Sequence, residues 1–332
     1  MFFENPFHTF TNQEFNDYAV KLFRFQYEHN EVYRAFCDGI HIQVENVSTI
    51  DLIPFLPISF FKSHQIKTTS FIEEKIFTSS GTTGMDFSQH YIKDLKIYKQ
   101  AFIASFNHFY SDFSSYTFLA LLPNYLERND SSLIYMMDHF ISHSSHSDSG
   151  YYLYNHEELF EKLIDLKTKG QKTILFGVTY ALLDFIEKYQ LDFPELIVFE
   201  TGGMKGRRKE LVKEELHQIL QKGFGVNTIH SEYGMCELLS QAYSAGNNLF
   251  FTPPWMKMVL RDEKEPIPSQ KMQKPIGAPP KTGVINIIDF ANIYSCSFIA
   301  TEDLGRIHEN GSIELLGRLD SAQIRGCNLL VI

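Results

Sequence analysis

The sequence predicts an α/β protein with largely parallel sheets, and three observations lead to this class. Short apolar runs at 116–123, 173–178 and 195–200 have the length and composition of buried strands. Helical patterns stand between these runs, so strands and helices alternate along the middle of the chain. After about residue 250 the pattern changes to proline-rich turns and short strands, which predicts a smaller, β-rich subdomain.

The length bounds the domain organisation. A chain of 332 residues suffices for one large α/β domain or two modest ones with a sizeable core. We expect residues 1–316 to form one large domain, of which about 250–316 is the β-rich subdomain. Residues 317–332 are then a short, hinge-like stub at the end of the chain.

The first third of the chain combines helices with irregular segments. Apolar spacing over 12–36 predicts helix, and the two prolines within 53–63 predict an extended segment. A loop of small residues at 79–84 precedes a helical pattern over 94–109. These elements lead into the first buried strand of the predicted sheet.

Further elements follow the strands at 173–178 and 195–200. A helix is predicted over 179–189, and the segment 203–221 turns into an amphipathic helix. Its apolar residues lie on roughly one face and are Leu211, Leu216, Ile219 and Leu220. Near the end of the chain, 283–290 and 312–317 have the pattern of strands.

Charge and composition exclude several classes of protein. The formal net charge of −10 argues against nucleic acid as a partner, because counterion release needs a basic surface. No apolar stretch is long enough for a transmembrane helix, and the first residues do not have the pattern of a signal peptide, so we expect a cytoplasmic protein. The four cysteines contain no CxxC pair, which argues against a zinc knuckle or a disulfide framework.

Two features have both a structural and a functional interpretation. His139, His143 and His146 have the spacing of ligands on one helix face, but a helix end that runs into a polar loop explains them better. The 30 Phe and 17 Tyr fit an aromatic core, and they also fit an apolar pocket for an acyl chain. Composition alone does not separate these two interpretations.

A phosphate-binding loop is the first chemical signal. The segment SSGTTG at 79–84 combines glycines, which let backbone N–H groups approach a phosphate, with hydroxyl donors. It lacks the lysine of a GxxxxGK[ST] loop and is a different motif. Four further segments follow in order: FETGGMKG at 199–206, SEYGMCE at 231–237, TEDLGR at 301–306 and GRLDSAQIRG at 317–326.

Together these five segments resemble the adenylate-forming superfamily of acyl- and aryl-CoA ligases. Within it, the chain is similar to the acyl-protein synthetase (LuxE) family, through segments at 54–64, 121–136, 199–210 and 325–330. The resemblance covers nearly the whole chain. It implies the fold of the large N-terminal domain of these enzymes, with layered α/β sheets and a β-rich subdomain, and without their mobile C-terminal domain.

The resemblance implies an ATP site. Gly202 and Gly203 match the turn that lines the adenine and the α-phosphate, while Tyr233 and Gly234 match the adenine-stacking position and the floor of the acyl pocket. The residues that match the loop around the β- and γ-phosphates are Ser79, Ser80, Gly81, Thr82, Thr83 and Gly84.

Four acidic or basic residues complete the implied site. Glu237 matches the carboxylate that holds Mg²⁺, and Asp303 matches the acid that accepts hydrogen bonds from the ribose hydroxyls. Arg318 matches an arginine that contacts the ribose or a phosphate, and Asp320 matches the hinge position. This chemistry activates a carboxylic acid as acyl-AMP, since Mg²⁺ and preorganised donors stabilise the charge that builds up on the α-phosphate.

The chain departs from the superfamily in its positive charges. Only twelve residues follow Asp320, so the lysine that normally contacts the reacting carboxylate has no counterpart in its usual place. A short tail is what the acyl-protein synthetase family leads one to expect. Either the reaction proceeds without that lysine, or a partner or another lysine supplies the charge. Lys205, Arg207 and Arg208 are candidates, although a solvated helix start explains the two arginines better.

Two cysteines stand near the implied site. Cys236 occupies a position that is usually Thr, and a packing role explains it better than a reactive one. Cys327 follows Arg325 and Gly326, and a neighbouring guanidinium favours the thiolate form. Its position resembles that of the acyl-protein synthetase cysteine, which takes the acyl group as a thioester.

Three functions remain open at this point. In the first, the enzyme adenylates a fatty or similar acid, loads Cys327 and passes the acyl group to an acyl reductase or a carrier protein. In the second, it is an acyl- or aryl-CoA ligase that resembles phenylacetate-CoA ligase. In the third, it is a non-catalytic nucleotide-binding subunit of a complex. The sequence leaves homo-oligomerisation open and does not identify the acid.

Overall fold

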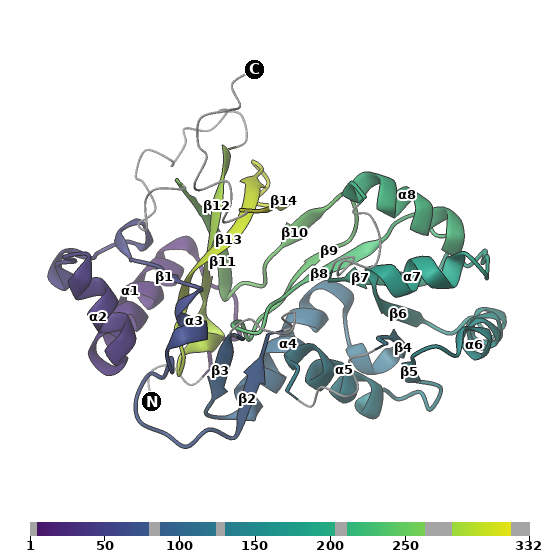
Figure 1. The fold of residues 1–332 in the computed structure, drawn as a ribbon, viewed down its shortest axis with the longest axis horizontal. Helices are drawn as coiled ribbons and strands as arrows, with labels where there is room; N and C mark the ends of the chain where they lie inside the picture. The colour runs from purple at the N-terminus through teal and green to yellow at the C-terminus, as the bar shows by residue number, and fades with distance from the viewer. Residues whose placement is uncertain (1–4, 80–86, 124–129, 203–210, 263–280, 320–332) are drawn as a thin grey trace. The chain divides into compact units, whose positions relative to one another are not determined.

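The computed structural model describes residues 5–79, 87–123, 130–202, 211–262 and 281–319 (Figure 1). The chain divides into two compact units. The first unit combines Met1–Glu74, Thr83–Asp94 and Phe251–Ile332, and the second combines Lys75–Thr82 and Leu95–Phe250. The predicted limits at 250 and 316 stay a prediction, while this division joins the N-terminal segment with the C-terminal strands.

The second unit contains a parallel sheet, in agreement with the predicted fold class. Its parallel strands follow the order β8-β7-β6-β4-β5, and β9 continues the sheet antiparallel to β8, with β10 beside it. β2 (Lys75–Thr78) also belongs to this unit. The strands of the sheet are β4 (Thr117–Leu121), β5 (Gly150–Tyr152), β6 (Thr173–Val178), β7 (Ile197–Thr201), β8 (His230–Tyr233), β9 (Ala242–Ser244) and β10 (Leu249–Phe251).

Helices cover both faces of this sheet (Figure 1). β7 shows the two faces directly, because successive residues of a strand point to opposite sides. Phe199 contacts Tyr110 of α4, with ring centroids 5.1 Å apart, whereas the next residue, Glu200, pairs with Lys213 of α8. The helices of this unit are α4 (Leu95–Tyr110), α5 (Ser132–His143), α6 (His156–Thr168), α7 (Thr179–Ile186) and α8 (Lys213–Phe224), with a 3-10 turn at Phe113–Ser115.

Local sequence explains where α8 begins and ends. Its first turn carries Glu214 and Glu215, which favour a helix N-terminus, and Gly225 ends it in the left-handed conformation with φ +65°. A Cβ at Gly225 would lie 2.5 Å from the Cα of Asp192, so the position requires glycine. Backbone bonds from the 191–193 segment to the last turn of α8 then fasten this end of the helix.

The first unit is an antiparallel sheet with helices. β11 (Met256–Arg261), β12 (Lys281–Asp289), β13 (Phe298–Ile307) and β14 (Ile313–Arg318) pair in sequence order, and β1 (Leu56–Pro57) runs parallel to β13. This confirms the strands predicted over 283–290 and 312–317. The other elements of this unit are α1 (Asn12–His29), α2 (Glu31–Gly39), α3 (Phe60–Ser63), β3 (Gln89–Ile92) and 3-10 turns at Val44–Asn46, Ile50–Leu52 and Phe290–Asn292.

The N-terminal helices are tied to this sheet. Thr11 and Glu14 form a capping box that starts α1, and Phe15 stacks on Phe290 with ring centroids 4.3 Å apart. The buried Gln26 donates to the carbonyls of Asn292 and Ile293, both at 3.0 Å. The segment predicted to be extended over 53–63 is so only in part, because α3 forms at its end.

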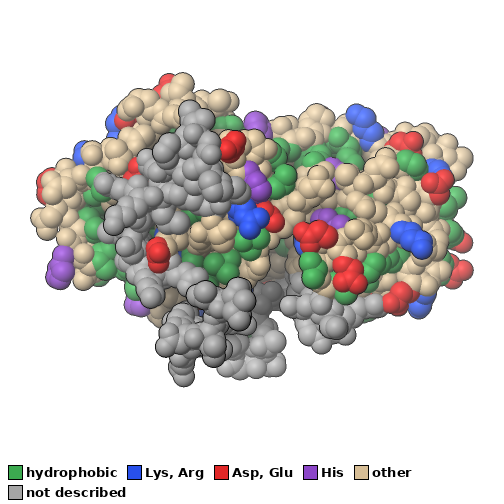
Figure 2. Space-filling model, turned by 90° about the horizontal axis from the view of Figure 1, so that it is seen from above, with side chains coloured by type: hydrophobic (Ala, Val, Ile, Leu, Met, Phe, Trp, Pro, Cys, Tyr) green, Lys and Arg blue, Asp and Glu red, His purple; other side chains and the backbone are tan. Residues whose placement is uncertain are grey.

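The surface is mixed in character. On the face seen in Figure 2, Lys and Arg side chains are scattered among acidic ones rather than gathered into one area. No helix among the described residues combines the length and the apolar character that a membrane span requires.

Candidate functional site

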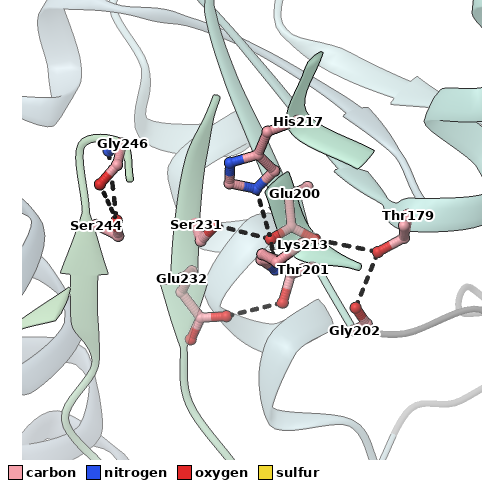
Figure 3. Close-up of polar contacts among 10 residues, drawn as sticks. All are labelled: Thr179, Glu200, Thr201, Gly202, Lys213, His217, Ser231, Glu232, Ser244 and Gly246. Carbon is pink, nitrogen blue, oxygen red and sulfur yellow. Dashed lines mark hydrogen bonds and ion pairs between the residues drawn. The ribbon is translucent and has the colours of Figure 1, made fainter. Parts of the chain in front are cut away.

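Polar residues gather where β6, β7 and β8 end (Figure 3). Thr179 starts α7 directly after β6, Thr201 ends β7 and Gly202 follows it, and Glu232 and Tyr233 end β8. The register pairs Val178 with Thr201 and Glu200 with Ser231, so the carboxyl ends of these parallel strands meet at one edge. Open α/β sheets bind their ligands at such an edge.

Glu200 is the centre of this cluster, on the α8 face of the sheet. Its side chain is only 1% exposed, yet both carboxylate oxygens have polar partners. Ser231 donates to Oε1 at 2.7 Å, Thr179 lies 3.1 Å from Oε2, and Lys213 pairs with Oε1. His217 Nε2 lies 3.6 Å from Oε1, one helical turn after Lys213 on α8.

The partners of Glu200 keep it ionised. Desolvation by itself raises the pKa of a buried carboxyl group, but His217, Lys213 and Ser231 more than offset it and lower the pKa of Glu200 to about 2. The cluster therefore contains a permanent buried negative charge that is matched by groups from α8 and β8.

Glu232 lies on the opposite face of the sheet. It is the cross-strand partner of Tyr243 on β9 and accepts a hydrogen bond from Thr201 at 3.0 Å. Burial raises the pKa of Glu232 to about 7, since the Thr201 hydroxyl only partly offsets the desolvation and the charge of Glu200 adds to it. Burial, and to a smaller degree the charge of Glu232, also raises the pKa values of Tyr98 and Tyr243.

Two glycines shape the edge of the cluster. Gly202 has φ +67°, and its carbonyl lies 2.9 Å from the Thr179 hydroxyl, which therefore faces both the turn and Glu200. A Cβ at Gly234 would lie 2.3 Å from Oε1 of Glu232, so any side chain there would displace this carboxylate. Both positions were predicted to contact the nucleotide or the acyl group.

Three of the predicted site residues, Tyr233, Gly234 and Glu237, lie at the end of β8 and in the turn after it. Tyr233 is buried and contacts Phe250 edge-on, with ring centroids 6.2 Å apart. Glu237 is only 5% exposed and follows the buried Cys236. A carboxylate fits the preference of Mg²⁺ for oxygen ligands, and Mg²⁺ at nucleotide sites often uses one or two carboxylates together with phosphates and waters.

The phosphate loop is described only at its first residue. Ser79 follows β2, whose last residue, Thr78, donates its backbone N–H to the carbonyl of Asp130 at 2.9 Å. Asp130 immediately precedes Ser131, which caps α5 by accepting a hydrogen bond from Ile134 N. The loop therefore starts beside the N-terminal end of a helix, where backbone N–H groups favour anions.

The first unit brings the two predicted ribose residues together. Asp303 on β13 is the register partner of Arg318 on β14, and Arg318 Nε donates to Asp303 Oδ1 at 3.0 Å. Leu319 N donates to the carbonyl of Glu302 at 2.8 Å and extends this pairing. The guanidinium is 67% exposed and the carboxylate 14%, so the pair lies at the surface of its own unit.

The remaining predicted residues lie outside the described part of the chain. This holds for most of the phosphate loop, the second glycine of the turn, the basic residues after it, the hinge and the C-terminal cysteine. These residues are Ser80, Gly81, Thr82, Thr83, Gly84, Gly203, Lys205, Arg207, Arg208, Asp320 and Cys327.

The structure also clarifies the histidines. α5 ends at His143, whose ring stacks on that of His139 with centroids 4.0 Å apart. This confirms the interpretation as a helix end. Within the described ranges, no group of three His, Cys, Asp or Glu side chains is arranged to hold a metal ion.

Sequence reasoning missed the groups around Glu200 and Glu232. A carboxylate directly after the apolar run 196–199 was one available signal. A second was the pair Lys213 and His217 at helical spacing on a helix predicted to return to the same sheet. Neither signal tells which face of the strand each carboxylate occupies.

Comparison with known proteins identifies the relatives of this chain. The family model described as "Acyl-protein synthetase, LuxE" matches residues 4–116. The chain is 23% identical over 343 aligned positions to a long-chain-fatty-acid–luciferin-component ligase from Aliivibrio fischeri, covering 96% of this chain and 88% of the relative. The corresponding ligase from Vibrio harveyi is 22% identical, with 92% and 84% covered.

Solved structures share the fold. A 2-hydroxyisobutyryl-CoA ligase in its postadenylation state aligns with a TM-score of 0.61 at 10% identity, over 93% of this chain and 68% of that one. ATP-bound MatB from Rhodopseudomonas palustris aligns with a TM-score of 0.51 at 15% identity, over 73% of this chain. The chain spans about half the length of MatB, 47%. These comparisons confirm both the predicted fold, that of adenylate-forming ligases, and the predicted resemblance to the acyl-protein synthetases.

Proposed function

We propose that the protein is an ATP-dependent fatty acid ligase of the acyl-protein synthetase type. The observation that carries the proposal is the similarity over 96% of the chain to a long-chain-fatty-acid–luciferin-component ligase. The places of three predicted site residues along the chain support it. Gly202 directly follows β7, Tyr233 ends β8 and Glu237 lies in the turn after it, and an open α/β sheet binds ligands at this edge.

In the first step, a carboxylate oxygen of the acid attacks the α-phosphorus of ATP. The P–O bond to pyrophosphate breaks, and acyl-AMP forms. Glu237 would hold Mg²⁺, which when bound neutralises charge on the phosphates. Asp303 would accept hydrogen bonds from the ribose hydroxyls, and Arg318 would contact the ribose or a phosphate. The loop that starts at Ser79 would contribute backbone N–H groups to the β- and γ-phosphates.

In the second step, the Cys327 thiolate attacks the acyl carbon and AMP leaves with the electron pair of the broken C–O bond. The product is a thioester on the enzyme. A thiol of a partner, such as an acyl reductase or a carrier protein, would then take the acyl group by thioester exchange. A cytoplasmic location fits this proposal, since ATP is available there.

Pyrophosphate exchange tests the first step. The purified chain is incubated with ATP, Mg²⁺, labelled pyrophosphate and fatty acids of different lengths. We expect label in ATP only when a suitable acid is present, and we expect Glu237→Gln to lower the rate by at least 10-fold, as loss of a charge-stabilising group does. Exchange that is absent with every acid would overturn the proposal.

A labelled acid tests the second step. We expect wild type to carry a thioester that hydroxylamine removes, and we expect Cys327→Ala to retain exchange but lose the covalent label. Cys236→Ala is the matched control. Cys236 is buried, and we expect the variant that lacks it to keep the label. A stable label on Cys327→Ala would rule out the role of Cys327, and rapid formation of free acyl-CoA after addition of coenzyme A would indicate a CoA ligase.

A further inference from the structure

Glu200 has more polar partners than its place in a sheet requires. Four side chains from three elements converge on one carboxylate that is 1% exposed: Thr179 from α7, Lys213 and His217 from α8, and Ser231 from β8 (Figure 3). A buried ion pair is weak evidence for stability, because an apolar pair of similar volume often stabilises a fold equally well. The cluster therefore calls for an explanation beyond packing.

The location of Glu200 supplies this explanation. It stands two residues before Gly202, and the Thr179 hydroxyl lies 3.1 Å from Glu200 Oε2 and 2.9 Å from the Gly202 carbonyl. The hydroxyl shares its one proton between these two acceptors. The position of the carboxylate therefore bears directly on the position of the turn, in which Gly202 has the left-handed φ of +67°.

Glu200 is also bonded to β8, which ends at Tyr233 and leads into the turn that contains Glu237. Ser231 donates to Oε1 at 2.7 Å, and it lies two residues before Tyr233 on β8. Through Thr179 and Ser231, one carboxylate is bonded to both segments that end at the candidate nucleotide site. Lys213 pairs with the same Oε1, and His217 Nε2 lies 3.6 Å from it, one turn further along α8.

We infer that Glu200 is a positioning residue, which holds the Gly202 turn and the end of β8 in the arrangement that binds ATP. The inference rests on the proposed function. It assigns no contact between Glu200 and the nucleotide, because the side chain is buried. The lowered pKa of Glu200 agrees with it, since a positioning anion has to stay charged over the working pH range.

The test compares ATP affinity with stability. Glu200→Gln keeps the size of the side chain and removes its charge. We expect the Kd and KM for ATP to rise about 10-fold or more, the KM for the acid to change less than twofold, and kcat per folded enzyme to fall less than fivefold, because misplacement of a site by a fraction of an ångström weakens binding strongly. A residue that serves stability alone would lower the folded fraction and leave the ATP Kd unchanged.

Thr179 provides the matched pair of variants. Thr179→Val removes the hydroxyl that links Glu200 to Gly202, whereas Thr179→Ser keeps it. We expect the first to raise the ATP Kd about fivefold, roughly the loss of one hydrogen bond, and the second to stay within twofold of wild type. These variants retain Glu200 and its ion pair with Lys213, so they keep the test valid even if Glu200→Gln does not fold.

Calorimetric titration of each variant with ATP and Mg²⁺ separates the possible outcomes. Equal ATP Kd values in wild type and folded Glu200→Gln, or in Thr179→Val and Thr179→Ser, would overturn the inference. Wild type that binds ATP but shows no acid-dependent pyrophosphate exchange would overturn the proposed reaction and leave the inference standing. Wild type that does not bind ATP would overturn both.

Discussion

The two faces of the sheet at β7 and β8 shift the pKa of a buried carboxylate in opposite directions. On the α8 face, Glu200 meets Lys213, His217 and two hydroxyls, and its pKa falls to about 2. On the α4 face, Glu232 meets aromatic rings and the Thr201 hydroxyl, and its pKa rises to about 7. Both carboxylates are desolvated, so the partners and not the burial decide which one stays charged.

This contrast predicts which residues the fold depends on. A buried carboxylate with polar partners on both oxygens contributes to the stability of the fold. Removal of one of these partners leaves its negative charge uncompensated. A buried carboxylate with one hydroxyl partner lowers the stability of the fold when it is ionised, so its effect changes with pH. The pair of Asp303 and Arg318 in the other unit provides a third environment, in which the arginine side chain is 67% exposed to water and the carboxylate 14%.

The largest loss of stability is expected for Lys213→Met. This change leaves Glu200 buried without its closest cation, and we expect it to lower the free energy of unfolding by about 3 kcal/mol at pH 7. Urea denaturation followed by circular dichroism measures this value. Lys222→Met, at the other end of α8, is the matched control and should change stability by less than about 0.5 kcal/mol.

The pH dependence of Lys213→Met sharpens this prediction. A carboxylate with a depressed pKa stabilises the fold above its unfolded pKa of about 4.5, and this contribution disappears as the pH falls towards 2. The difference between Lys213→Met and wild type should therefore shrink below about pH 4.5. A difference that stays constant from pH 7 to acid would mean that Lys213 acts through packing and not through Glu200.

A smaller effect of opposite sign is expected for Glu232→Gln. The folded pKa of about 7 exceeds the unfolded value of 4.5, so the folded state binds more protons and loses stability as the pH rises through this window. Glutamine resembles the protonated form and avoids this loss. We expect the variant to match wild type near pH 4.5 and to be more stable by about 2 kcal/mol at pH 8.

Thermal unfolding in a series of buffers measures this difference. Glu45→Gln, a change of the same type at an exposed position, controls for the general loss of one negative charge. If Glu232→Gln were less stable than wild type at every pH, the carboxylate would be ionised and satisfied in the folded protein, and the contrast between the two faces would fail.

The smallest change in stability is expected for Asp303→Asn. Exposed ion pairs contribute about 0 to 1 kcal/mol, and the guanidinium partner of Asp303 is 67% exposed. We expect stability to change by less than about 1 kcal/mol, while the ATP KM rises at least fivefold if Asp303 contacts the ribose as proposed. Arg306→Met, which breaks the neighbouring pair with Glu314, is the control and should leave the ATP KM unchanged.

Periodicity predicted much of the fold, because strand and helix patterns in 116–123, 173–200 and 211–221 are local properties of the chain. The five ordered segments led to the predicted nucleotide site in the same way, and that site stays a prediction. The contacts of Glu200 with α8 could not be predicted, since they depend on how a helix 13 residues away along the chain returns to the sheet. SEYGMCE contains Glu232, but no local pattern shows that aromatic side chains surround it.

The division into two units could not be predicted from the periodicity of the sequence either. Gln26 contacts backbone atoms of residues 292 and 293, which are 266 and 267 positions away in the sequence. An apolar helix face predicts that the helix packs against the core. It does not predict which strands the helix contacts. Contacts at this separation are set by the closure of the whole chain and not by any segment of it.

The two ends of α8 are fastened differently, and this has a mechanical consequence. At one end, next to Gly225, backbone hydrogen bonds join the helix to the 191–193 segment. At the other end, Lys213 forms an ion pair with Glu200. A rod of this length, about 18 Å for twelve residues, transmits displacement along its axis better than it bends. A displacement of the exposed segment at Asp192 would therefore shift α8 as a whole and, through Lys213 and Glu200, displace Gly202.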